Sequence, residues 1–166
     1  MSPVELLAGQ PFFSGLAPAQ LERIADCARL AEHRAGTLLL RQGDEARAIH
    51  LLLEGSVALE VTVPGRRPLV LETLGEGELV GASWLLPPAR AHFDVRARTF
   101  LRTLRIDTAC LLAAMETDSA LGYAFCRRFM EVVLRRLQAT RLQLTDLYAH
   151  PRLFPSAGCK PSEKGE

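Results

Sequence analysis

The chain has 166 residues, and its 20 basic and 19 acidic side chains leave a net charge of +1, which gives no general attraction to nucleic acid or membrane surfaces. This length is enough for one domain with a hydrophobic core. No apolar run approaches the roughly 20 residues that a membrane-spanning helix needs. The N-terminus lacks the basic and apolar regions of a signal peptide, so we expect a cytoplasmic protein.

The four cysteines are Cys27, Cys110, Cys126 and Cys159, and no two of them form a CxxC pair. Their spacing predicts neither a disulfide framework nor a cysteine-based metal site. We expect three buried thiols and one thiol in the C-terminal tail, as is usual in a reducing compartment.

Residues 1–29 are expected to form a helical lead. Pro18 suits the first turn of a helix, and Leu21, Ile24 and Ala25 follow it at helical spacing.

From residue 30 to residue 106, short apolar runs are separated by glycines. Every second residue within Val57–Val63 is apolar, which predicts a half-buried strand, and a similar alternation recurs at Val95, Ala97 and Thr99. Many short strands at this spacing are typical of a β-sandwich or β-barrel.

Residues 107–148 are predicted to be helical. Asp107 or Thr108 can cap a first helix, and Thr117 and Asp118 can cap a second. The second helix, over residues 121–148, has no proline. At a rise of 1.5 Å per residue it would be about 42 Å long. A helix of that length needs a second surface to cover it.

One face of this long helix carries mostly apolar residues at alternating gaps of four and three residues: Cys126, Met130, Val133, Leu137, Thr140, Leu144 and Leu147. We name this set the seam. A seven-residue repeat is typical of two packed helices and predicts a homodimer interface. The alternative is that the seam packs on the chain's own barrel. Self-association is favoured, because the helix has a second apolar face at Phe125, Phe129 and Val132 and one barrel cannot cover both faces.

Three segments resemble the sensor half of the catabolite-activator/fumarate-nitrate regulator (Crp/Fnr) family: PFFSGLAPAQLERIA, LLLRQGDEARAIHLLLEGSVAL and RRLQAT. The resemblance covers about residues 10–148 and implies a cyclic-nucleotide-binding domain. The implied fold is mainly β with flanking helices. In it, a double-stranded β-helix (jelly-roll) barrel at residues 30–106 lies between the N-terminal helices and a C-terminal dimerisation helix.

The chain departs from this family after the long helix. The family's regulators continue into a helix-turn-helix domain, whereas residues 149–166 contain three prolines and are expected to be a flexible tail. We therefore expect no direct binding to DNA.

The second departure lies in the family's phosphate-binding cassette. It begins with Gly-Glu, whose carboxylate binds the ribose, and ends with Arg-Ser or Arg-Thr, whose guanidinium binds the cyclic phosphate. In GELVGASWLLPPARAHFDVRA, Ala82 replaces the glutamate and Ala91 follows the arginine. The resemblance implies a cyclic nucleotide or another phosphate-bearing nucleotide as ligand, in contact with Gly81, Ala82, Ser83, Arg90, Ala91, His92, Thr140 and Arg141.

Several of these side chains have a structural alternative. Arg90 can be a solvated loop residue, Trp84 a core residue rather than a stacking platform, and His92 a structural histidine. The long helix also has five arginines, which form either a solvated basic face or a surface for an acidic partner: Arg127, Arg128, Arg135, Arg136 and Arg141.

These observations predict a non-enzymatic sensor or regulatory module that is homodimeric and acts through a protein partner. The alternative is an accessory subunit docked on a larger oxidoreductase complex, since small domains that resemble this one accompany some NAD-reducing hydrogenases. A metal-dependent barrel enzyme would gather histidines in an HxH motif, but the four histidines are isolated: His33, His50, His92 and His150.

Overall fold

The computed structural model describes residues 2–62 and 64–149, the last three by their backbone alone. Contacts divide the chain into two units, Met1–Arg128 and Phe129–Glu166. The predicted tail lies outside the described residues, apart from Ala149 at the end of the last helix.

The first unit begins with helices, continues through eight strands and returns to helix. Its helical elements are α1 (Pro3–Ala8), the 3₁₀ turns η1 (Pro11–Phe13) and η2 (Ala82–Trp84), α2 (Pro18–Asp26) and α3 (Thr108–Thr117), while α4 (Ser119–Ala149) runs on into the second unit. The strands are β1 (Ala28–His33), β2 (Leu38–Leu40), β3 (Ala48–Glu54), β4 (Val57–Val61), β5 (Leu69–Leu74), β6 (Leu79–Val80), β7 (Asp94–Ala97) and β8 (Leu101–Asp107).

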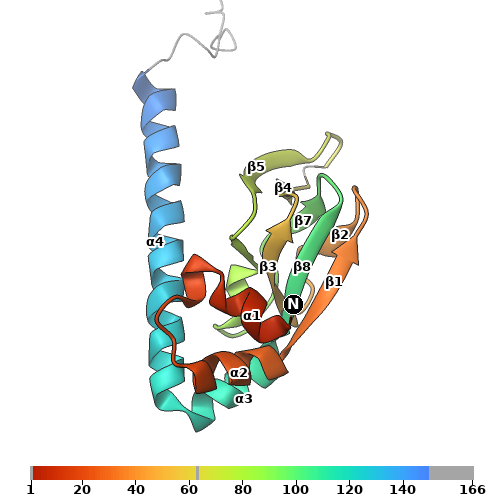
Figure 1. The fold of residues 1–166 in the computed structure, drawn as a ribbon. Coiled ribbons are helices and arrows are strands. Elements are labelled where there is room, and N and C mark those ends of the chain that lie inside the picture. The colour runs from red at the N-terminus through yellow and green to blue at the C-terminus, as the bar shows by residue number, and fades with distance from the viewer. Residues whose placement is uncertain (1, 63, 150–166) are drawn as a thin grey trace, which may run out of the picture. The chain divides into compact units, whose positions relative to one another are not determined.

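The strands form two four-stranded sheets, which Figure 1 shows together with α1, α2 and α3 at one end of them. One sheet has the order β1-β8-β3-β6 and the other β2-β7-β4-β5, and all neighbouring strands are antiparallel. The mainly β jelly-roll fold with flanking helices is confirmed, as is the long C-terminal helix.

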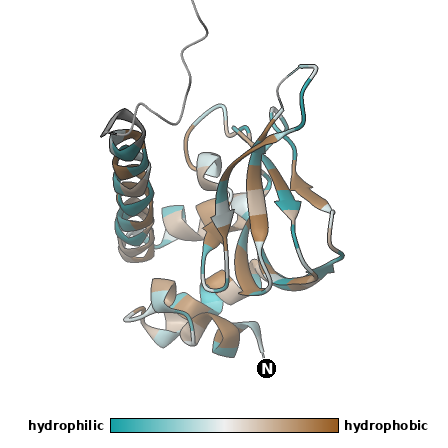
Figure 2. Cartoon of the chain, turned by 90° about the horizontal axis from the view of Figure 1, so that it is seen from above, coloured by the Kyte–Doolittle hydropathy of each residue, from teal (hydrophilic) through white to brown (hydrophobic). Residues whose placement is uncertain are grey.

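Apolar side chains from both sheets form a core cluster. The strands carry much of the hydrophobic colour in Figure 2, and apolar residues of several strands are buried together. The members of the cluster are Leu52, Val57, Leu74, Val80, Val95, Ala97 and Leu101.

Three helices contact two strands of the sheet β1-β8-β3-β6. α1 and α2 pack against β1, and α3 packs against β8. The predicted caps are confirmed: Asp107 Oδ1 accepts the Cys110 N–H at 2.9 Å, and Asp118 Oδ1 accepts the Leu121 N–H at 3.1 Å. These bonds fix where α3 and α4 begin.

The predicted alternation in Val57–Val63 is wrong at Glu60, and residue 63 itself lies outside the described residues. Glu60 is 9% exposed although it alternates with apolar neighbours. A bulge interrupts the pairing of β4 with β5 at this point, and Glu60 forms an ion pair with Arg96 of β7. An ion pair makes burial of a carboxylate tolerable.

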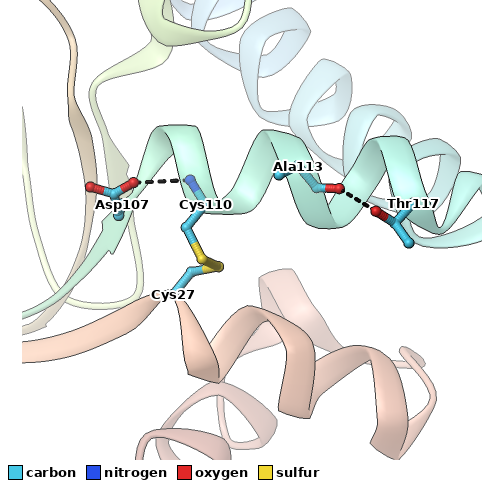
Figure 3. The surroundings of a disulfide bond; sticks show 5 residues. All are labelled: Cys27, Asp107, Cys110, Ala113 and Thr117. Carbon is cyan, nitrogen blue, oxygen red and sulfur yellow. Dashed lines mark hydrogen bonds between the residues drawn. A yellow bond between two sulfur atoms is a disulfide. The ribbon is translucent and has the colours of Figure 1, made fainter.

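The prediction that the chain has no disulfide is also wrong, because Cys27 and Cys110 are bonded (Figure 3). The fold brings the end of α2 beside the start of α3, across 83 residues of sequence, which no local spacing could reveal. Cys110 is exposed and Cys126 half-buried, so the expectation of three buried thiols fails for these residues too.

None of the described helices is long and apolar enough to cross a membrane. Over the same residues, no group of three or more His, Cys, Asp or Glu side chains is placed to hold a metal ion.

Candidate functional site

The cassette begins where β6 ends. Gly81 has a φ of +95°, and a Cβ atom there would lie 3.2 Å from the Ala48 carbonyl oxygen. Both facts explain why glycine stands at the turn into η2. Trp84 ends η2 and is 5% exposed, so its structural alternative as a core residue is confirmed.

The other end of the cassette pairs with the loop before β3. The Ala91 N–H donates to the Asp44 carbonyl, and the Gly43 N–H donates to the Ala91 carbonyl, both at 2.8 Å. Arg90 is exposed, and its Nη1 donates to the Gly43 carbonyl at 2.7 Å. The arginine predicted to bind phosphate thus holds a main-chain oxygen of the neighbouring loop.

The remaining cassette residues offer little polar chemistry. Ala82 is exposed and Ser83 half-buried, so no carboxylate stands where the family places one. Ala91 is buried, and the exposed His92 lies edge-on to Phe93 with ring centroids 6.4 Å apart. Contact of these residues with a ligand stays a prediction.

Thr140 and Arg141 lie on α4 in the second unit, and both are exposed. The Thr140 hydroxyl donates to the Arg136 carbonyl of its own helix at 3.0 Å. Their role as nucleotide contacts therefore also stays a prediction.

An aromatic cluster joins the cassette to the first turns of α4. Trp84 lies edge-on to Phe125, with centroids 6.0 Å apart and an interplanar angle of 81°. Phe12 lies 5.2 Å and Phe13 6.4 Å from the same ring. The cassette, the N-terminal lead and α4 therefore meet on one fully buried side chain.

The seam is exposed over much of its length. Met130 is 56%, Leu137 43% and Leu144 49% exposed, while Cys126 is half-buried. The side chain of Leu147 lies outside the described residues. A dimer interface along the seam stays a prediction.

The basic face of α4 is not wholly solvated. Arg128 donates to the Ala124 carbonyl of its own helix at 3.2 Å and also to the Ser14 carbonyl in the N-terminal lead. This arginine therefore helps to hold the lead against the start of α4.

A polar cluster formed by β4, β7 and the adjoining loops was not foreseen. Arg96 donates through Nε to Glu60 and through Nη1 to the Gly36 carbonyl, both at 3.0 Å. Asp94 accepts the Gln42 N–H at 2.8 Å and the Thr62 hydroxyl at 3.1 Å. The cluster borders an open cavity of about 440 Å³ lined by Leu38, Arg41, Gln42, Thr62, Asp94 and Arg96. Period-two spacing on β7 was the signal that could have placed Asp94 and Arg96 on one face.

Comparison with known proteins places this geometry in context. The model of the cyclic nucleotide-binding domain matches residues 30–118. The cyclic AMP receptor protein of Thermus thermophilus is 34% identical over 143 residues, which cover 85% of this chain and 61% of that protein. A lysophospholipase, nte1 of Aspergillus fumigatus, is 33% identical over 108 residues, which cover 61% of this chain and 7% of the enzyme. The chain thus spans less than two thirds of either relative.

Among solved structures, a cyclic nucleotide-binding domain from Methylobacillus flagellatus superposes with a TM-score of 0.74. The match covers 95% of this chain and 85% of that one at 13% identity, so it shows the fold alone.

Proposed function

Because this chain belongs to the family of cyclic nucleotide-binding domains, we propose that it is a non-enzymatic regulatory module. Its cassette binds a phosphate-bearing nucleotide, and α4 pairs two copies of the chain. Binding of the nucleotide moves α4, and a protein partner responds to that movement. The contact between Trp84 and Phe125 carries this proposal, because it joins the proposed binding site to the proposed output helix.

Close packing makes that contact an effective link. Phe125 is fully buried and Trp84 nearly so, and densely packed side chains cannot move independently. A ligand that shifts η2 must therefore displace Phe125 and the first turns of α4. Edge-on aromatic pairs of this kind contribute about 0.5–1.5 kcal/mol beyond the area that they bury.

Arg90 supports an anionic ligand. A guanidinium has five N–H donors, and Arg90 uses one of them on the Gly43 carbonyl within the described part of the chain. The exposed fork can receive a phosphate while it keeps that bond. Since Ala82 offers no acceptor to a ribose hydroxyl, we expect weaker binding of cyclic AMP than a cassette with glutamate provides.

Titration of the full chain with cyclic AMP, cyclic GMP, cyclic di-GMP and NADPH tests the proposal. Calorimetry detects binding, and for the three cyclic nucleotides the emission of Trp84, the only tryptophan, reports on the cassette. We expect micromolar binding of at least one nucleotide that Arg90→Ala abolishes. Arg98→Ala, which removes an exposed arginine outside the cassette, is the matched control and should bind normally.

A second variant separates binding from signalling. Phe125→Leu should leave the binding heat intact and abolish the ligand-induced change in hydrogen exchange of α4. If none of the four nucleotides binds, the sensor proposal fails and the accessory-subunit alternative becomes the better account. Affinity capture of a defined oxidoreductase complex by the native protein would then support it.

A further inference from the structure

We propose that Cys27 and Cys110 form a reversible thiol–disulfide site, whose redox state controls how firmly α2 holds α3. The inference is independent of the nucleotide proposal, since neither cysteine belongs to the cassette or the seam. It assigns a redox function to residues for which the sequence predicted only buried thiols.

The bond joins two helix ends. Cys27 is the C-terminal cap of α2 and is 7% exposed, while Cys110 lies in the first turn of α3 and is exposed (Figure 3). The two Cα atoms are 5.5 Å apart. One sulfur thus belongs to a residue at the surface and the other to a residue in the interior, which gives a reductant one side from which to attack.

Other contacts keep the two cysteines close when the bond is open. The Asp107 N–H donates to the Cys27 carbonyl at 2.9 Å, and Ala28 pairs with Ile106 at the end of the sheet. Arg23 and Asp118 also join α2 to the end of α3 across 3.7 Å, although both side chains are partly exposed. The thiols therefore stay within reach of each other, and oxidation can close the bond again without refolding.

The chemistry requires a dithiol reductant, either a small molecule or a protein with two thiols. Its thiolate attacks Cys110 Sγ and forms a mixed disulfide, and Cys27 leaves as a thiolate that takes up a proton. The second thiol of the reductant then loses its proton and attacks the reductant's first sulfur, which is bonded to Cys110 Sγ. Cys110 is released as a thiolate that takes up a proton. Two electrons and two protons pass to the protein, and the reductant becomes a cyclic or intramolecular disulfide.

Opening the bond should act locally. We expect the sheet β1-β8-β3-β6 to persist without the disulfide, because its strand β8 pairs with both β1 and β3 and buries Leu104 and Ile106 completely. By contrast, the disulfide is the only covalent cross-link outside the main chain that the described residues show between the end of α2 and α3. Reduction should therefore loosen α3, which leads directly into α4.

The test uses the Cys126→Ser/Cys159→Ser variant of the full chain, so that only the proposed pair can react. Unreduced protein should show no free thiol after denaturation, and dithiothreitol should release two. Removal of the reductant under oxidised dithiothreitol should restore the bond. On reduction we expect amide exchange in α3 to rise about tenfold or more through local opening. Amides of β3 and β8 should keep their protection.

Adding Cys27→Ser and Cys110→Ser to this background gives a second readout. This variant should show the fast α3 exchange of the reduced protein with or without dithiothreitol. Two free thiols in the unreduced protein would overturn the proposal. So would α3 exchange that is the same in both redox states. Loss of protection in β3 and β8 on reduction would also overturn it, since the bond would then be a structural staple.

Discussion

His50 is a titratable side chain in the interior of the jelly roll, only 4% exposed. Its Nδ1 lies 3.2 Å from the Thr103 hydroxyl, and the ring of His33 lies 5.9 Å away. Burial lowers the pKa of His50 to about 3, and the charges of His33 and Arg105 act in the same direction. The folded state therefore holds this histidine neutral.

We predict that the domain loses stability as the pH falls from about 6.5 toward 3. Because the pKa of His50 is lower in the folded state, the unfolded chain binds the proton first as the pH falls. Each pH unit within this range then lowers the free energy of unfolding by about 1.4 kcal/mol. His33, whose pKa burial also lowers, adds to the slope near pH 6. Urea unfolding from pH 7 to 4.5 measures it. His50→Gln should flatten the slope, and the exposed-site control His92→Gln should not. An equal slope in His50→Gln would refute the assignment.

Gly55 shows how strictly one turn constrains the chain. Its φ is +88°, and an added Cβ would lie 2.2 Å from the Phe100 carbonyl oxygen. Gly36 has a similar φ of +85°, but no atom lies within 4 Å of a Cβ added there. A substitution at Gly36 therefore measures the cost of the left-handed backbone without a steric clash.

Gly36→Ala should therefore cost about 1 kcal/mol, the usual penalty for a left-handed alanine. Gly55→Ala adds a backbone clash and should cost at least about 3 kcal/mol or prevent folding. Thermal melts of the two variants make the comparison. Equal losses would mean that the turn at residue 55 relaxes freely.

At the scale of elements, β4 and β7 are joined by a partly buried ion pair between Glu60 and Arg96. The Glu60 side chain is 11% exposed and its partner Arg96 is 39% exposed. Removing the arginine leaves a carboxylate with little water and no counter-charge, which is costlier than losing an exposed pair.

Arg96→Leu should destabilise the domain by about 2 kcal/mol or more. Arg98→Leu, at an exposed position two residues further along, should change stability by less than about 0.5 kcal/mol. Adding Glu60→Gln to Arg96→Leu should recover part of the loss, because the stranded charge is gone. No recovery in chemical unfolding would show that the pair acts through packing instead.

Local patterns predicted the elements well. Pro18 marks the start of α2, and Asp107 and Asp118 mark the starts of α3 and α4, because caps and periodicity depend on near neighbours. The wrong predictions at Cys27, Cys110 and Glu60 involve distant partners. Neither the Cys27–Cys110 bond nor the ion pair from Glu60 to Arg96, 36 residues away, leaves a trace in local spacing.

For the whole molecule, we predict that α4 depends on association through the seam. Isolated helices are marginal in water, and the second unit exposes the seam residues Met130, Leu137 and Leu144. We predict that the protein is a dimer at micromolar concentration and that Leu137→Glu shifts it toward monomer by tenfold or more in Kd.

Leu142→Glu is the matched control, since Leu142 lies on the same helix, off the seam, and is 68% exposed. Sedimentation velocity over a dilution series should show the control as a dimer. Dissociation of both variants alike would place the interface elsewhere, and a monomeric parent chain would remove the dimer from the proposed function.

The exposed methyl group of Ala82 has an evolutionary consequence. It projects from the start of η2, outside the packed interior, so a longer side chain there does not disturb the core. In the proposed binding site, a single-codon change from alanine to glutamate would install an acceptor for a sugar hydroxyl with little expected effect on stability. Under this proposal, the preference for a ligand can change through substitutions that leave the fold intact.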